Sequence, residues 1–108
     1  MCIRDRDFPN LKILLAHGGR PLWMQTAFFL IRRHRNVYLD ISGIPPKTLL
    51  KYFPRLDEIA HKTLFGTDWP GPGVPDIKKN LDEFRALPLS AEVQQQILTN
   101  TALTIWPA

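Results

Sequence analysis

Three short apolar segments, separated by stretches of helical character, most constrain what this chain can fold into. Each has the length of a β-strand and is closely followed by glycine or aspartate, which punctuate secondary structure. Because helices would connect the strands, they should run parallel in one sheet of an α/β fold. Their nearly continuous apolar character also predicts strands that are covered on both faces. The three segments are residues 11–16 (LKILLA), 36–41 (NVYLDI) and 63–67 (TLFGT).

The segments between and after these strands carry helix signals. Pro21 suits the first turn of a helix whose apolar residues recur at a spacing of three to four. Asp76 and Ser90 are suited to cap two later helices with their side-chain oxygens. The expected order is therefore βαβαβαα. The predicted helices span residues 21–35, 46–53, 54–61, 76–87 and 90–105.

Size and composition fit one small domain and exclude several protein classes. The chain has 108 residues, of which 44% are hydrophobic and 22% charged, an ordinary globular composition. The lone Cys2 excludes a disulfide framework and a cysteine-based zinc site. No apolar run is long enough to cross a bilayer, and we find no signal-peptide pattern. We therefore expect a cytoplasmic protein with no membrane partner.

The basic balance of the chain suggests nucleic-acid binding, but the distribution of charge argues against it. The formal net charge is +4, and the basic residues peak in residues 32–35 (RRHR) at the expected end of a helix. Cations there complement the negative end of the helix dipole. We interpret this run, and with it His34 and His61, as a solvated surface, and we expect no nucleic-acid partner.

Polar side chains stand at the carboxyl end of all three predicted strands. They are His17, Asp40 and Asp68. Parallel α/β folds bind ligands at this edge, so the three side chains could converge. An imidazole and a carboxylate that converge can bind a metal ion or move a proton.

Each of these residues also has a structural interpretation. His17 could cap its strand by bonding to the backbone, and Asp68 could cap the loop that follows it. Asp40 could accept hydrogen bonds from the loop amides of Ser42 and Gly43. The residues alone leave the catalytic and the structural interpretations open.

Arg20 and Trp69 are candidates for substrate binding, again with structural alternatives. Arg20 could hold a substrate carboxylate, or it could form a structural ion pair. Trp69 could form a wall of a pocket, or it could pack within its loop.

Four motifs, in order along the chain, resemble the amidohydrolase-related family of metal-dependent TIM-barrel enzymes. Residues 8–19 (FPNLKILLAHGG), 37–43 (VYLDISG) and 64–70 (LFGTDWP) resemble segments at the family's sixth, seventh and eighth strands. Residues 97–102 (ILTNTA) resemble its closing helix, except that Thr101 interrupts the usual Asn-Ala pair. The resemblance implies an α/β fold that is part of a (β/α)8 barrel, with strands six to eight, their helices and a C-terminal helix.

The resemblance also implies roles for two residues. Asp68 matches an aspartate that binds a divalent metal, commonly zinc, and helps to activate a water molecule. His17 matches a histidine that is a metal ligand in some members and an acid or base beside the metal-bound water in others. It implies no role for Asp40.

Several parts of the family pattern are missing. A complete barrel needs about 250 residues. The chain contains no His-x-His motif and no match for the histidine of the fifth strand, so it offers two metal ligands where catalytic zinc normally takes three. We expect residues 1–7 to be a leader unrelated to the family and residues 8–108 to be the C-terminal part of a barrel. Open sheet edges on such a piece should promote self-association into a homo-oligomer.

The expected function is that of a metal-dependent hydrolase or decarboxylase acting on a small carboxylic acid or lactone. Metal-activated water would supply the chemistry in the whole enzyme, and the isolated chain should be inactive. One alternative is a metal-independent lactone hydrolase in which Asp68 is the general base. Another is a non-catalytic domain that binds a small acid.

Overall fold

The computed structural model describes residues 7–72 and 74–107, and its centre is a parallel sheet of three strands. The strands are β1 (Ile13–Leu15), β2 (Val37–Asp40) and β3 (Thr63–Leu64), in the order β1-β2-β3. Leu15 pairs with Leu39, and Leu39 pairs with Thr63. The predicted parallel α/β sheet is confirmed, although each strand is shorter than its apolar segment.

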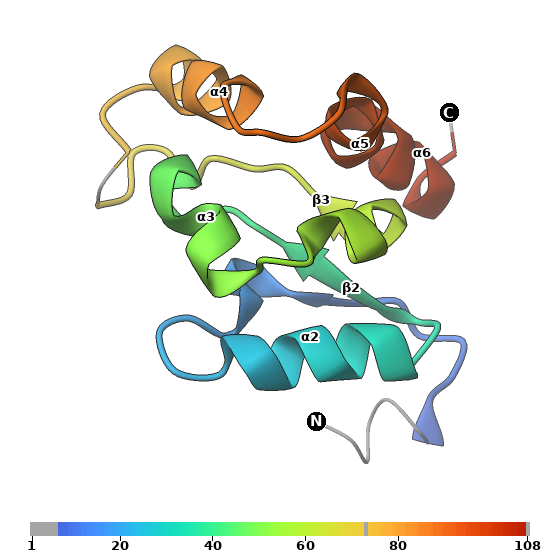
Figure 1. The fold of residues 1–108 in the computed structure, drawn as a ribbon. Helices are drawn as coiled ribbons and strands as arrows, with labels where there is room; N and C mark the ends of the chain where they lie inside the picture. Colours follow the sequence, from blue (N-terminus) through green and yellow to red (C-terminus); the bar gives the residue numbers. More distant parts are fainter. Residues whose placement is uncertain (1–6, 73, 108) are drawn as a thin grey trace.

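The helices follow one another around the strands, from α2 beside β2 to α6 beside β3 (Figure 1). The predicted side-chain caps are confirmed, because Asp76 accepts the Lys79 amide and Ser90 accepts the Val93 amide. The helices are η1 (Ala16–Gly19), α2 (Met24–Arg33), α3 (Pro46–Tyr52), η2 (Leu56–Lys62), α4 (Ile77–Arg85), α5 (Ala91–Gln95), η3 (Gln96–Asn100) and α6 (Thr101–Ile105). Among the described residues, no helix has the length and apolar character needed to span a membrane.

The expected helix start at Pro21 is wrong, because α2 begins at Met24. The peptide bond between Arg20 and Pro21 is cis, and the chain first turns before it enters the helix. At the other end of α2, the buried Lys62 donates to the carbonyls of Ile31 and His34. Burial lowers the pKa of Lys62. Its side chain thereby bonds the Ile31 carbonyl at the helix end and shares the His34 carbonyl with the Val37 amide, which lies at 3.3 Å.

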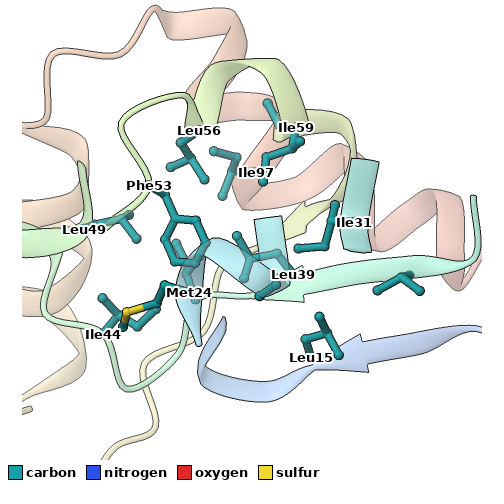
Figure 2. Close-up of a cluster of buried hydrophobic side chains, with 14 of the residues drawn as sticks. Leu15, Met24, Ile31, Leu39, Ile44, Leu49, Phe53, Leu56, Ile59 and Ile97 are labelled. Carbon is teal, nitrogen blue, oxygen red and sulfur yellow. The ribbon is translucent and has the colours of Figure 1, made fainter. Parts of the chain in front are cut away.

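The main core lies between the sheet and the helices, where aliphatic side chains from β2, α2 and η2 pack together (Figure 2). Val37 and Leu39 are fully buried, whereas the alternate residues Tyr38 and Asp40 remain partly exposed. One face of β2 is therefore more deeply covered than the other, although none of the four residues of this strand is fully exposed.

The last helical segment bends around β3. The predicted helix 90–105 is divided by η3, a π-turn, and the carbonyl of Ile97 within it accepts the amide of Phe65 at 3.2 Å. This bond occupies the edge of β3 that faces away from β2, because the Leu64 carbonyl faces β2 and accepts the Ile41 amide at 3.1 Å. Thr101 is buried and donates its hydroxyl to the Ala60 carbonyl at 3.0 Å, so it ties α6 to η2.

Replacing Gly18 by alanine should destabilise the fold by about 2–4 kcal/mol. Gly18 has a φ of +56°, and an added Cβ would lie 2.9 Å from side-chain atoms of both Leu39 and Phe53. Urea unfolding of the Gly18→Ala variant would measure the loss. Gly19→Ala is the matched control, since its φ is +78° but its nearest contact, the Trp23 Cβ, lies at 3.2 Å. Equal losses in the two variants would contradict a packing cost at Gly18.

Candidate functional site

The candidate site lies where the loops after the three strands meet. His17 is in η1 directly after β1, Ser42 and Gly43 follow β2, and Asp68 follows β3. The parallel pairing of the strands brings these loops to the same edge of the sheet. The sequence-based expectation that His17 and Asp68 stand at this edge is therefore met.

His17 has an unusual backbone and a defined hydrogen bond. Its φ is +59° and its ψ is 17°, which places it in the left-handed region. The Nδ1 atom of its partly buried ring lies 2.7 Å from the carbonyl oxygen of Ser42. Because a carbonyl can only accept, Nδ1 carries the hydrogen in this bond, and the neutral ring keeps its lone pair on Nε2.

Asp68 shares the left-handed backbone, with a φ of +62°. Its carbonyl accepts the amide of Gly71 at 2.6 Å, which closes a turn that contains the cis peptide bond between Trp69 and Pro70. Among the described residues, His17 and Asp68 are the two non-glycine residues with positive φ. Such conformations are uncommon outside glycine, although histidine and aspartate tolerate them better than most residues, and they cluster at functional sites.

Gly43 is the point at which the two side chains meet. A Cβ atom built on Gly43 would lie 2.8 Å from the Nδ1 of His17 and 3.3 Å from the Oδ2 of Asp68. The absent side chain thus leaves a space with an imidazole on one side and a carboxylate on the other. These are two ligand types that zinc accepts. The described residues contain no group of three histidine, cysteine, aspartate or glutamate side chains that could hold a metal ion.

Asp40 takes the structural role that the sequence offered as an alternative. Its Oδ1 accepts the Ser42 amide at 3.0 Å, and its Oδ2 accepts the Ser42 hydroxyl at 2.6 Å. The expected second contact, to the Gly43 amide, is not among the hydrogen bonds of the described residues. Sequence reasoning missed Ser42 as a site residue, because a serine before glycine is read as an ordinary turn residue.

Arg20 and Trp69 lie at the rim of the same site. Arg20 is exposed, and its Nη1 donates to the carbonyl of Gly43. Trp69 keeps 53% of its surface exposed, and its amide donates to the Thr67 hydroxyl at 3.2 Å. Arg20 therefore contacts the loop on which His17 and Asp68 meet, while the Trp69 side chain stands next to Asp68 in the chain.

A separate cavity of about 540 Å³ lies away from these residues. Its lining combines the end of α2 with the residues that precede β2 and β3, so it is at the opposite end of the strands from the candidate site. Arg33, Arg35, His61 and Lys62 line it together with Glu58. The exposed position of His61 agrees with its interpretation as a surface residue, whereas His34 is partly buried.

Comparison with known proteins gives one match. A protein-family model described as amidohydrolase matches residues 6–108. Neither the curated proteins nor the solved structures contain a match to the chain. Because the family model covers nearly the whole sequence and includes all three strand ends of the candidate site, the chain belongs to the amidohydrolase family.

Proposed function

We propose that the chain provides part of the active site of a metal-dependent hydrolase or decarboxylase that acts on a small carboxylic acid or lactone. The observation that carries the proposal is the convergence of His17 and Asp68 on Gly43, with both donors in the left-handed conformation. The alternating strands and helices support a further proposal, that β1, β2 and β3 correspond to three consecutive strands of a (β/α)8 barrel. In such barrels the loops after the strands form the active site.

His17 and Asp68 would hold the metal ion. The hydrogen bond from Nδ1 of His17 to Ser42 leaves the Nε2 lone pair for a metal ion or for a proton. The Asp68 carboxylate can bind a cation or accept a proton from water. When bound, a metal ion would lower the pKa of a water ligand and make hydroxide available near neutral pH.

Histidine and aspartate are both ligand types that zinc accepts. However, the described residues supply two such ligands, whereas a catalytic zinc site normally has three protein ligands. We therefore propose that the remaining metal ligands come from residues outside the described part of this chain, 7–72 and 74–107. In this proposal the chain by itself binds zinc weakly and does not turn over substrate.

Arg20 and Trp69 would contact the substrate. One nitrogen of the Arg20 guanidinium is engaged by the Gly43 carbonyl, and a guanidinium has further N–H donors. Those donors suit a substrate carboxylate, since arginine binds carboxylates through two parallel hydrogen bonds. The exposed indole of Trp69 offers an apolar surface next to Asp68 for the body of a small acid.

Zinc binding by the 108-residue chain tests the ligand assignment. In isothermal titration calorimetry, His17→Ala and Asp68→Asn should each weaken zinc binding at least about tenfold, because even residues that only orient a ligand commonly contribute that much. His61→Ala and Asp57→Asn are matched controls, because they change the same residue types at exposed positions outside the site. Equal zinc affinity in all five proteins would refute the assignment.

Metal removal tests the reaction class in a protein that carries this chain within a complete barrel. Chelation should abolish hydrolysis or decarboxylation, and added zinc should restore it. Asp68→Asn should lower kcat by about 10²–10⁴-fold, the usual contribution of a group that moves a proton in the transition state. Activity that survives chelation but is lost in Asp68→Asn would favour the metal-independent lactone hydrolase. Binding of a small acid without turnover would favour a non-catalytic domain.

Replacing Gly43 by alanine should weaken zinc binding by about tenfold or more, in the range found when ligand positioning is disturbed. The added Cβ would lie 2.8 Å from the His17 Nδ1 and 3.3 Å from the Asp68 Oδ2, so the imidazole and the carboxylate would have to shift, and the φ of +73° disfavours a side chain. Calorimetry on Gly43→Ala would measure the change. The control is Gly19→Ala, which has a similar φ but adds its Cβ beside Trp23. The same zinc affinity in both variants would contradict a role of Gly43 in positioning the His17 and Asp68 side chains.

A further inference from the structure

Ser42 donates two hydrogen bonds to one carboxylate, which fixes it in the turn after β2. The Oδ1 of Asp40 accepts the Ser42 amide at 3.0 Å, and the Oδ2 accepts the Ser42 hydroxyl at 2.6 Å. Gly66, just beyond β3, leaves room for this pair, because a Cβ there would lie 3.1 Å from the Ser42 Cβ and 3.4 Å from the Asp40 Oδ1. The backbone and the side chain of Ser42 are thus held by the same partner.

Ser42 in turn presents two oxygen atoms to the ring of His17. Its carbonyl oxygen lies 2.7 Å from Nδ1, and its hydroxyl oxygen lies 3.4 Å from the same atom. The carbonyl can only accept, and the hydroxyl has already donated its hydrogen to Asp40, so both oxygens face Nδ1 with lone pairs. A hydrogen on Nδ1 is favourable in this position, whereas a lone pair on Nδ1 would be repelled by both oxygens.

From this arrangement we infer that Asp40 is a positioning residue for His17. Asp40 holds the turn that places the Ser42 carbonyl against the ring, and it directs the Ser42 hydroxyl hydrogen towards itself. Both effects favour the tautomer with hydrogen on Nδ1. The use of the resulting Nε2 lone pair for a metal ion or a proton rests on the proposed function. The tautomer itself depends only on the hydrogen bonds of Asp40, Ser42 and His17.

Nitrogen-15 NMR of the labelled 108-residue chain tests this inference directly, because the two tautomers of a neutral imidazole give different ring nitrogen shifts. At one fixed pH at which His17 is neutral, the wild type should populate the Nδ1–H form almost exclusively. Asp40→Ala should lower the ratio of Nδ1–H to Nε2–H at least about tenfold, as expected if one charge-assisted hydrogen bond is removed from the network. Asp40→Asn should give an intermediate ratio, because its single amide oxygen can accept from only one of the two Ser42 groups that Asp40 binds.

Asp76→Ala is the matched control. It also removes an aspartate that accepts a backbone amide, at 2.6 Å from the Lys79 nitrogen, but on the N-terminus of α4. The control should leave the His17 tautomer unchanged. A folded Asp40→Ala protein with the wild-type tautomer ratio would overturn the inference. If Asp40→Ala does not fold, Ser42→Ala replaces it, because this variant removes the hydroxyl and keeps the carbonyl. We expect a smaller fall in the ratio of Nδ1–H to Nε2–H. An unchanged ratio would overturn the inference.

Zinc titration of the same variants separates this inference from the proposed function. If Asp40→Ala changes the tautomer but leaves zinc affinity unchanged, the positioning role stands and the metal role of His17 fails. If the tautomer is unchanged while His17→Ala still abolishes zinc binding, the positioning role fails and the metal role stands. If both hold, Asp40→Ala should weaken zinc binding about 10–100-fold, the usual effect of removing a group that orients a metal-binding histidine.

Discussion

The turn of Ser42 and Gly43 after β2 holds the candidate site together. Asp40 bonds both the amide and the hydroxyl of Ser42, and the Ser42 carbonyl accepts from the ring of His17. Gly43 has no side chain, so the Asp68 carboxylate can lie beside the imidazole. Residues from all three strand ends therefore depend on one short stretch of backbone. Because β2 pairs with both neighbouring strands, the position of this turn is fixed by the sheet rather than by flexible side chains.

The left-handed conformations of His17 and Asp68 are held by their surroundings. After His17, Gly18 packs so closely against the core that a Cβ would lie 2.9 Å from the side chains of Leu39 and Phe53, and the Arg20 amide bonds to the His17 carbonyl at 2.9 Å. After Asp68, the Gly71 amide closes the turn. A left-handed residue with a side chain costs about 1–2 kcal/mol, which core packing and turn bonds can offset. The same glycines that permit the turns thus also set the directions of the His17 and Asp68 side chains.

Sequence patterns predicted the fold where local signals and tertiary packing agree. The three strands, the parallel sheet and the helix caps at Asp76 and Ser90 follow from segment length and from the hydrogen-bonding capacity of the side chains. The start of α2 and the early end of β3 could not be predicted. The first depends on how the chain turns after η1. Just beyond β3, the Phe65 amide bonds to a carbonyl 32 positions later, which no local pattern indicates. Within the site, their positions at strand ends indicate His17 and Asp68. The role of Ser42 depends on its backbone carbonyl, and because every residue has one, no side-chain pattern could indicate it.

The two edges of the sheet differ, and the difference bears on how a metal site could be completed. Beyond β3, the Phe65 amide is already bonded to the Ile97 carbonyl, whereas no described strand pairs with the outer edge of β1. A further strand could therefore add beside β1 without breaking an existing bond, while addition beside β3 would require the bond to η3 to be exchanged for a strand bond. The loop after a strand beside β1 would emerge next to His17, because parallel strands end at the same edge. Under the proposed function, a third metal ligand would therefore come from the His17 side of the site, with Asp68 on the opposite side.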